Sequence, residues 1–305
     1  MKRAVKMKWA GPAALLLGAV LLSLVLLSAA PSVRADADAG EQAALIAEAD
    51  RLADEEKFEE SNRVLLRLVK LNPDHPDVYW KIAKNYYDLG ERIPIEENRA
   101  KKLDMYVRCE RYAKTGYDKN PDLADNAFWM AVGMSQQAQT KGIASTILSD
   151  RGLPSRIEAF YIKATQATEY HYRTEDTDTV SAAHFALGMF YRKLPESRAA
   201  EVLLRTRGDM DKSVEHHRIA VKMHPHNIDY NKELGVSLLC RGQRRNQPAD
   251  IEEGKKYLNK AISLPAKSSL DRMDQADSKR LLEDHSLACG YSRVQQEEVG
   301  DSALK

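Results

Sequence analysis

Cysteine, glycine and proline are scarce in this sequence, and their scarcity narrows the kinds of site that it can hold. Its 305 residues include 3 cysteines, 15 glycines and 11 prolines, and the glycines and prolines fall between helical stretches rather than in runs. Cys109, Cys240 and Cys289 are far apart and odd in number, and no pair has the spacing of metal ligands. We therefore interpret all three as buried residues that pack like small apolar side chains.

Motifs for catalysis and cofactor binding are also absent. The sequence has no glycine-rich phosphate loop, no G-x-S-x-G nucleophile motif and no H-E-x-x-H metal motif. The nearest approach to a metal site is a group of four histidines, His216, His217, His224 and His226. Consecutive helical residues point about 100° apart, so His216 and His217 cannot easily share a metal ion. We expect a non-enzymatic protein with no cofactor and no metal, in which His217 packs in the core and the other three are solvated.

The alternation of apolar and polar residues that is typical of a half-buried strand is missing over any strand's length. Apolar residues make up 43% of the chain, enough for a core, and charged residues make up 30%, with both signs interspersed. This composition is typical of amphipathic helices with solvated outer faces. The sequence therefore predicts an all-α fold.

The first 35 residues differ from the rest in charge and hydrophobicity. They contain five Lys or Arg and no acidic residue, and an apolar stretch covers 13–30. The V-R-A sequence at 33–35 predicts a signal peptide over 1–35 and a mature chain that starts at Asp36, in the periplasm or outside the cell. Because the stretch 13–30 is long for a signal peptide, the alternative is an uncleaved membrane anchor. The polar residues at 32–34 favour cleavage.

The rest of the chain is mildly acidic. It has 41 basic and 45 acidic residues, a net charge of −4 with histidine neutral. Such a balance is unfavourable for general nucleic-acid binding, so we expect no nucleic-acid partner. No later stretch is apolar enough to cross a membrane, so contact with a membrane is expected only if the N-terminal segment is not cleaved.

One stretch, 207–239, carries the pattern of a helical repeat. Ser213, His217, Ala220 and Pro225 follow one another at offsets of four, three and five, and Gly235 lies ten residues beyond the proline. Small residues let two antiparallel helices approach closely, and a proline ends a helix. The pattern is typical of a tetratricopeptide boundary, where the second helix of one repeat turns into the first helix of the next.

The same offsets recur and divide the chain into five predicted helix pairs. They appear again as Ser61, Leu65, Leu68 and Pro73, and as Cys109, Ala113, Gly116 and Pro121. We expect Gly133, Gly188 and Gly235 at helix crossings in repeats three to five. The predicted domain plan is a polar lead-in at 36–41, a tetratricopeptide-like solenoid of five helix pairs over 42–291 and a flexible tail at 292–305.

Irregular segments interrupt this plan, and a further helix closes it. Loops are predicted at Thr140–Pro154 and Arg241–Pro248, and the helix that follows the first loop is predicted to run from about Ser155 to Tyr170. A charged, helix-prone insert precedes Gly208. The segment Ser268–Cys289 is predicted to be the capping helix that an open-ended solenoid needs for solubility.

Five blocks of sequence resemble the regulator of microtubule dynamics family, whose members are tetratricopeptide-like. Within about 47–284, the blocks are YWKIAKNYYDLG (Tyr79–Gly90), KNPDLADNAFWMAVGM (Lys119–Met134), the Gly142-Ile143 loop, HFALGMFYRKLP (His184–Pro195) and KAISLPAKS (Lys260–Ser268). The resemblance implies a helical solenoid that binds proteins, and it brings no catalytic residues. It does not imply microtubule binding, because an exported chain would meet no tubulin. The region Pro154–Lys163 also departs from the basic helix start expected there.

The first helix of each such pair lines a concave face, where we expect a binding groove. Met130 and Met134 lie one turn apart, as do Phe185 and Met189, so these four would form an apolar centre that adapts to a partner. The polar edges of the groove would be Lys81, Asn85, Arg192 and Lys232. The alternatives are that the methionines belong to the core and that Lys81 and Asn85 are ordinary surface residues.

The sequence thus predicts an exported, non-enzymatic scaffold that holds a protein or peptide partner in its concave groove. One alternative is a tether anchored in the membrane by residues 13–30. Another is a carrier of an apolar small molecule or lipid, with the Thr140–Pro154 loop as a lid over a cavity. N-terminal sequencing would separate the scaffold from the tether, and a ligand retained in a native mass measurement would favour the carrier.

Overall fold

A computed structural model describes residues 39–142, 145–146 and 149–291 of the chain. Within these ranges strand pairing is limited to an isolated bridge between Arg173 and Asp178, which confirms the all-α prediction. A first helix covers 39–54. The others are α2 (Phe58–Leu71), α3 (Val78–Glu91), α4 (Ile95–Lys119), α5 (Ala124–Lys141), α7 (Leu153–Gln166), α8 (Thr179–Lys193), α9 (Arg198–Leu204), α10 (Met210–Met223), α11 (Ile228–Arg245), α12 (Pro248–Ser263), α13 (Ser269–Glu283) and the 3₁₀ helix η1 (His285–Gly290).

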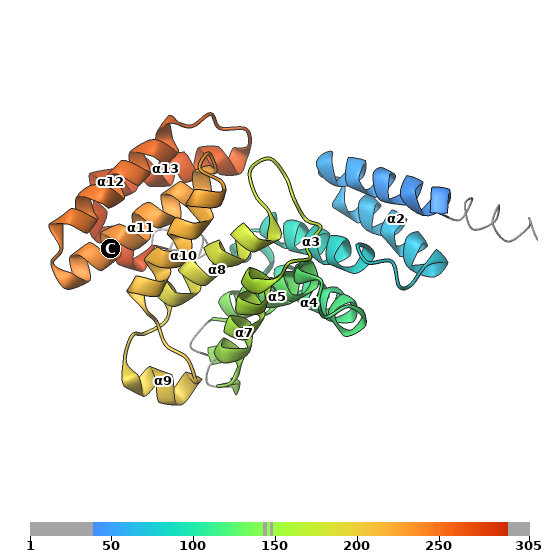
Figure 1. Ribbon diagram of the computed structural model, residues 1–305, viewed down its shortest axis with the longest axis horizontal. Helices are drawn as coiled ribbons and strands as arrows, with labels where there is room; N and C mark the ends of the chain where they lie inside the picture. The colour runs from blue at the N-terminus through green and yellow to red at the C-terminus, as the bar shows by residue number, and fades with distance from the viewer. Residues whose placement is uncertain (1–38, 143–144, 147–148, 292–305) are drawn as a thin grey trace, which may run out of the picture.

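The helices form five stacked pairs that follow one another along the long axis of the molecule (Figure 1). Helix 39–54 pairs with α2, α3 with α4, α5 with α7, α8 with α10 and α11 with α12, and α13 packs on the last pair. The first helices of neighbouring pairs also touch, because α3 contacts α5, α5 contacts α8, α8 contacts α11 and α11 contacts α13. They therefore make an inner layer covered by α4, α7, α10 and α12. This arrangement confirms the predicted tetratricopeptide-like solenoid with a capping helix.

Glycines stand where helices cross, as the repeat pattern predicts. A Cβ atom on Gly235 would lie 2.8 Å from Leu258 Cδ2, and one on Gly133 would lie 2.7 Å from the backbone nitrogen of Glu110. A Cβ atom on Gly188 would lie 2.2 Å from His217 Cδ2. These separations are well below the optimum of about 3.5–4.0 Å for non-bonded carbon atoms, so a larger residue would push the helices apart. The three predicted crossing positions are confirmed.

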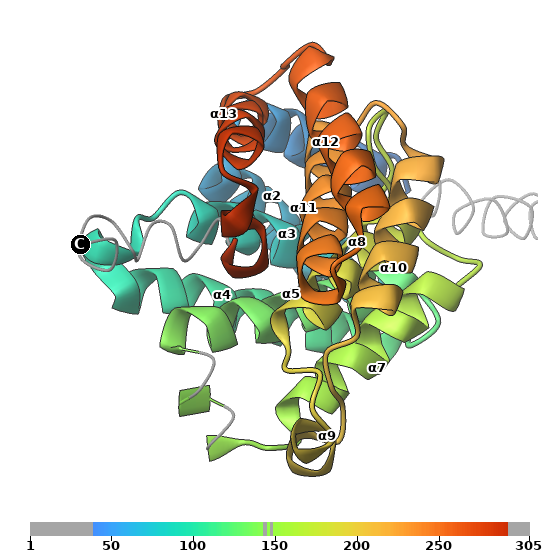
Figure 2. The same cartoon turned by 90° about the vertical axis from the view of Figure 1, so that its left-hand side faces the viewer.

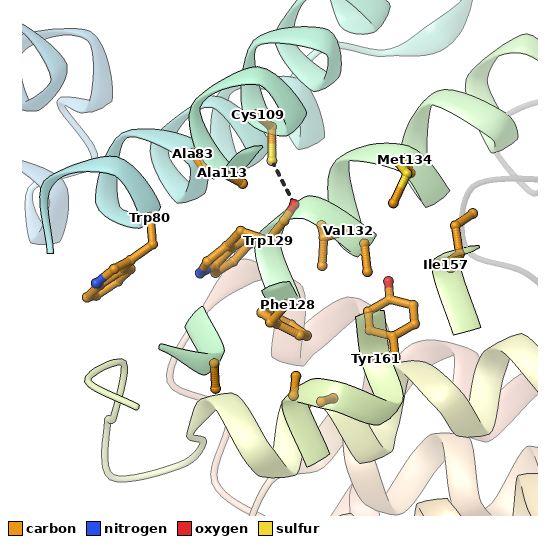
Figure 3. Close-up of a cluster of buried hydrophobic side chains, with 14 of the residues drawn as sticks. Trp80, Ala83, Cys109, Ala113, Phe128, Trp129, Val132, Met134, Ile157 and Tyr161 are labelled. Atoms are coloured by element: carbon orange, nitrogen blue, oxygen red, sulfur yellow. Dashed lines mark hydrogen bonds between the residues drawn. The ribbon is translucent and has the colours of Figure 1, made fainter. Parts of the chain in front are cut away.

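The largest cluster of buried apolar side chains lies between α3, α4, α5, α7 and α8 (Figure 3). Trp129 and Phe128 lie at its centre, with ring centroids 5.0 Å apart. Cys109 on α4 is fully buried beside them, with its sulfur 3.5 Å from the carbonyl oxygen of Trp129. Separate clusters fill the N-terminal pair and the C-terminal pairs. Cys109 therefore packs as the small apolar residue that its repeat position predicts.

The segment 167–178 departs most from the predicted secondary structure. The helix expected to reach Tyr170 ends at Gln166, and an extended segment follows. The buried carboxylate of Asp125 on α5 accepts hydrogen bonds from the backbone N–H groups of His171 (2.7 Å) and Tyr172 (2.8 Å) and from the Thr179 hydroxyl (2.5 Å). These bonds pair backbone groups that a helix would otherwise pair. The segment is thereby fixed over α5, and Figure 1 shows its loop rising beside α3.

The predicted basic loop at Arg241–Pro248 is mostly helix, which corrects the sequence interpretation. Helix α11 continues to Arg245 and ends at Asn246, which has a left-handed backbone conformation with φ of 53°. The arginines are held by acidic partners on other elements, Arg241 by Asp250 at 2.7 Å and Arg245 by Asp211 at 2.7 Å. The charged insert before Gly208 does form a helix, α9, which projects from the body beside α7 (Figures 1 and 2).

Two of the three cysteines are joined, which corrects their interpretation as independent buried residues. A disulfide links Cys240 on α11 to Cys289 on η1, across 49 residues, and Cys109 remains a free buried thiol. The pairing arises because α13 and η1 fold back onto α11. The predicted capping helix at Ser268–Cys289 is divided accordingly into α13 and η1.

The predicted signal peptide or anchor at 1–35 and the predicted tail at 292–305 lie outside the described residues. Within the described part of the chain, no helix combines the length and the hydrophobicity needed to cross a bilayer.

Candidate binding cavity

A cavity of about 450 Å³ lies between the inner-layer helices α5 and α8, the start of α11 and the outer-layer helix α7. Small-molecule and cofactor sites in proteins usually measure about 300–1,000 Å³, so the cavity is large enough to hold a ligand group. Its walls are mainly apolar and aromatic, and they include Trp129, Val132, Tyr161, Phe185, Met189 and Phe190.

Helical spacing explains how these side chains come to face one space. Phe185, Met189 and Lys193 follow each other at intervals of four on α8, and Val132, Gln136 and Gln139 do so at intervals of four and three on α5. Residues three or four positions apart share one face of a helix. Because α5 and α8 are neighbours in the inner layer, their two stripes border the same cavity.

Tyr172, from the extended segment 167–178, forms part of one end of the cavity. Its ring lies 6.0 Å from the ring of Trp80 and 6.1 Å from that of Trp129, between α3 and α5. The ammonium group of Lys84 lies 5.8 Å from the centre of the same ring. Burial raises the pKa of the Tyr172 hydroxyl, which therefore stays neutral. Tyr172 thus belongs to the cavity wall and packs beside Trp80 on α3 and Trp129 on α5.

Several polar groups in the cavity wall have partners of their own. Lys193 Nζ donates to Gln139 Oε1 at 3.0 Å. Ser135 Oγ and Tyr161 Oη lie 3.2 Å apart. The cavity is therefore an apolar, largely aromatic space with scattered polar groups, and its polar lining is uncharged apart from Lys193 and Asp229.

The four residues predicted to form the apolar centre of the groove fall in two places. Phe185 and Met189 are partly buried and line the cavity, whereas Met130 and Met134 do not. Met134 is only 5% exposed and packs with Ile157 in the core (Figure 3). Met130 is partly buried against the same core. On α5 the prediction therefore chose the wrong face of the helix, because Val132 and not Met134 lines the cavity.

Lys81 and Asn85, predicted at a polar edge of the groove, lie outside the cavity lining. Lys81 Nζ is 2.7 Å from Asp50 Oδ1 and 4.6 Å from the ring centre of Trp80. Asn85 is 3% exposed and donates to Ser61 Oγ at 2.9 Å. Asn85 therefore holds α3 against the first helix pair, and its predicted place at a groove edge is wrong.

Arg192 and Lys232 are also misplaced by the prediction, because both are buried. Arg192 donates to Glu233 Oε2 at 2.6 Å, and Lys232 donates to Asp274 Oδ1 at 2.5 Å. Burial alone would raise the pKa of the Glu233 carboxyl, but the positive charges of Arg192 and Lys232 outweigh it and hold that pKa well below its usual range. These residues form a buried ionic cluster between α8, α11 and α13, not an edge of the groove.

Among the histidines, His217 is a packed core residue, as predicted, whereas His216 and His224 have partners of their own. His217 Nδ1 lies 2.9 Å from Ser237 Oγ, and His217 Nε2 lies 3.2 Å from the carbonyl oxygen of Phe185. His216 is partly buried, with its Nδ1 2.9 Å from His184 Nδ1, and His224 Nε2 lies 3.2 Å from Asp178 Oδ2. The described residues contain no group of three or more potential metal ligands.

Trp129 is one of the cavity residues that the sequence did not indicate. Its ring lines the cavity, and its buried Nε1 has no hydrogen-bond partner among the described residues. The helical pattern identifies it as a packing residue, which it also is. Neither spacing nor hydrophobicity distinguishes a tryptophan whose N–H is paired from one whose N–H is unpaired, so no signal in the sequence could have marked it.

Comparison with solved structures finds the same fold in other tetratricopeptide proteins. A thermophilic tetratricopeptide protein of Thermus thermophilus is 13% identical, with a TM-score of 0.53, over 79% of this chain and 100% of that chain. PilF of Pseudomonas aeruginosa is 10% identical, with a TM-score of 0.50, over 88% of this chain and 95% of that chain. At such identities the likeness concerns the fold alone. No curated protein sequence gives a significant match.

The family comparison covers most of the solenoid. The model described as "Regulator of microtubule dynamics protein 1-3" matches residues 45–286, from the first helix to η1. This match confirms the resemblance carried by the five sequence blocks. The chain belongs to the regulator of microtubule dynamics protein 1-3 family.

Proposed function

We propose that this protein is a non-enzymatic binding protein that holds a segment of a partner protein in the cavity on its concave face. The cavity itself is the observation that carries the proposal. It lies on the inner layer of the solenoid, where neighbouring first helices make a continuous surface. It is lined by aromatic rings and Met189, and a partly exposed apolar surface of this kind is typical of a binding site.

The chemistry of the lining suits a protein segment. Phe185 and Met189 are only partly buried, so a partner side chain can complete their burial. Methionine is flexible and polarizable and adapts to different apolar shapes. A segment laid against α5 and α8 would meet the apolar side chains of Val132 and Phe185 and the ammonium group of Lys193, one turn beyond Met189.

The proposal is tested by a charge placed in the cavity. Met189→Glu should abolish or strongly weaken partner capture, because the carboxylate would lose its hydration on binding. Since Met189 is partly exposed, the helical content and the melting temperature should change little. The matched control is Met273→Glu on α13, where the methionine is 47% exposed and outside the cavity lining.

The readout is a pull-down with immobilised protein from the compartment in which it resides, followed by affinity measurement with the purified partner. Capture by the wild type and Met273→Glu, with loss in Met189→Glu, supports the proposal. Equal capture by all three proteins would exclude the cavity as the binding site.

A carrier of an apolar small molecule is the second candidate, favoured by the size of the cavity and by its mainly apolar and aromatic lining. It predicts that the protein retains a molecule during purification, and that native mass spectrometry finds an added mass in the wild type and Met273→Glu but not in Met189→Glu. A bare protein mass under conditions that preserve binding would speak against a carrier.

We further propose that the protein is exported with cleavage after Ala35. The V-R-A sequence at 33–35 supports cleavage. The Cys240–Cys289 disulfide supports an oxidising compartment, because disulfides rarely persist in a reducing cytosol. N-terminal sequencing of the natural protein should give Asp36 as its first residue. An intact N-terminus on membrane-bound protein would favour instead a tether anchored by residues 13–30.

A further inference from the structure

The charged insert 196–207, which contains α9, is a closed loop on the solenoid that the proposed function does not use. Its two ends meet, because the backbone nitrogen of Gly208 donates to the carbonyl oxygen of Pro195 at 2.9 Å. The side chains of Leu204 and Thr206 are buried, and α9 projects from the body (Figures 1 and 2). The insert therefore presents the outer face of α9 to the surroundings on a fixed base.

The outer face of α9 carries aliphatic side chains that the protein does not cover. Val202 is 86% exposed and Leu203 is 42% exposed, and Val202 is the most exposed large hydrophobic residue in the described part of the chain. Single exposed apolar residues are common on protein surfaces, so a second feature is needed before they indicate a binding site.

The second feature is a pair of arginines that bracket these side chains. Arg198 precedes Val202 by one turn, and Arg205 follows at the end of the helix. Both are exposed, and neither forms an ion pair within the residues that the structure describes. Arg205 also has a left-handed backbone, with φ of 57°, which glycine adopts at less cost. Replacing Arg205 with glycine would therefore remove the charge without straining the backbone.

The acidic residues of the insert are already neutralised. Glu201 Oε2 lies 3.3 Å from Arg207 Nη1, and Glu196 Oε2 lies 3.0 Å from Arg244 Nη1. These ion pairs leave the two bracketing arginines as an excess of positive charge around the aliphatic side chains. The tip of the insert is thus both apolar and basic, although the chain from residue 36 onward is acidic overall.

A surface that is apolar and basic fits an anionic membrane. Aliphatic groups can enter the boundary between headgroups and acyl chains, while guanidinium groups bind lipid phosphates. A protein partner fits less well, because a standard interface takes about 20–30 residues from each side and α9 has only 7. A membrane sets no such minimum, since a short element adds its affinity to whatever else holds the protein at the surface.

We propose that α9 docks the protein on an anionic phospholipid membrane, with Val202 and Leu203 in the interfacial layer and Arg198 and Arg205 on lipid phosphates. None of these residues lines the cavity, so the proposal is independent of what the cavity binds. It is also independent of whether the N-terminal segment is cleaved.

The test places an environment-sensitive fluorophore, nitrobenzoxadiazole, on α9 of the full-length protein through Val202→Cys. The new thiol is the one that reacts, because Cys109 is fully buried and Cys240 is bonded to Cys289. Vesicles that contain phosphatidylglycerol should shift the emission to the blue, and nitroxide-labelled lipid should quench it. Vesicles of phosphatidylcholine alone, or 1 M salt, should weaken both effects because they remove or screen the attraction between charges.

Matched variants test the residues in turn. The label on Val107→Cys, at a 42% exposed position on α4, should not respond to vesicles. In protein labelled on α9, Arg198→Gln and Arg205→Gly should each raise the vesicle concentration that gives half the shift by about fivefold, the effect of losing one cation near an anionic surface. Arg67→Gln removes an exposed cation from α2 and should change that concentration by less than about twofold.

The outcomes are distinct. A blue shift on α9 that needs anionic lipid and is weakened by loss of either arginine supports docking. No shift on anionic vesicles, or an equal shift at Val107→Cys, would overturn it. A shift that appears without vesicles and grows with protein concentration would show that a second copy of the chain covers α9, and it too would overturn the proposal. Partner capture by the cavity is tested separately, by Met189→Glu.

Discussion

His217 shows how one buried side chain couples packing to pH. It fits against Gly188, where a Cβ atom would overlap its ring, and it is bonded to Ser237 and to the Phe185 carbonyl. Burial, reinforced by the nearby positive charge of Arg192, lowers its pKa from 6.5 to about 3. The folded protein therefore keeps His217 neutral under conditions in which the unfolded chain would protonate it.

This difference predicts a loss of stability in acid. Above pH 6.5 both states hold a neutral His217, so it adds no pH dependence there. Between pH 6.5 and about 3 only the unfolded state gains the proton, so the free energy of unfolding should fall as pH falls, by up to about 1.4 kcal/mol per pH unit from this residue. Urea unfolding should be measured at several pH values across this range. The free energy of unfolding should depend less steeply on pH in His217→Asn than in the wild type. His184, whose pKa is lowered to about 4, titrates in both proteins and cancels in the comparison. The same pH dependence in both proteins would contradict the assignment of this loss of stability to His217.

Residues whose positions follow from local sterics were predicted well, and residues whose partners lie far away were not. Gly133, Gly188 and Gly235 mark crossings because the repeat offsets require small residues there. Arg192 looks like a surface residue of α8 in sequence, since its partner Glu233 lies 41 residues later. Lys232 is paired with Asp274, 42 residues later. Nothing in a helical pattern reveals such pairings, which is why two buried charges were predicted at a groove edge.

The same distinction applies to whole elements. The start of α13 was predicted almost to the residue, and the cap is local: Ser268 Oγ accepts from Asp271 N at 3.0 Å, while Asp271 Oδ2 accepts from Ser268 N at 2.9 Å. The end of α7 was missed, because it depends on Asp125, more than 40 residues earlier. The disulfide that fixes η1 was missed for the same reason, since the fold alone brings Cys240 to Cys289.

The disulfide should stabilise the C-terminal cap strongly. Cross-linking residues across a long loop restricts the unfolded chain, and loss of a native disulfide typically costs about 2–4 kcal/mol. Cys289→Ser should therefore lower the free energy of unfolding by that amount, measured by urea titration and far-ultraviolet circular dichroism. Reductant should lower the wild-type midpoint to that of the variant and leave the variant unchanged. A wild-type midpoint that does not respond to reductant would mean that the bond is not formed in the protein.

At the scale of the whole molecule, the segment 167–178 departs from simple solenoid behaviour. In an ideal solenoid each repeat contacts only its neighbours. Here a segment between the third and fourth helix pairs returns to the second, with His171 Nδ1 2.6 Å from Asp77 Oδ1 and the Tyr172 ring beside Trp80. The repeat pattern predicted the solenoid itself, but not this crossing, which places Tyr172 in the cavity wall, whereas Lys81 and Asn85 lie outside the lining.

Asp125 holds the segment 167–178 against α5. Removing its carboxylate should therefore loosen this segment and leave α12 and α13 unchanged. Asp125→Ala would leave the partly buried N–H groups of His171 and Tyr172 without their acceptor, each at a cost of at most about 1–3 kcal/mol. Asp125→Asn, which keeps one oxygen acceptor, should lose less. Hydrogen exchange should show faster exchange of the 170–173 amides in Asp125→Ala and an intermediate rate in Asp125→Asn. Protection in α12 and α13 should not change, because their link to the segment, from Lys267 to Glu175 and Asp176, does not involve Asp125. A uniform loss of protection along the chain would show instead that the helix pairs unfold as a single unit. The segment 167–178 would then have no separate role in joining the second helix pair to the fourth.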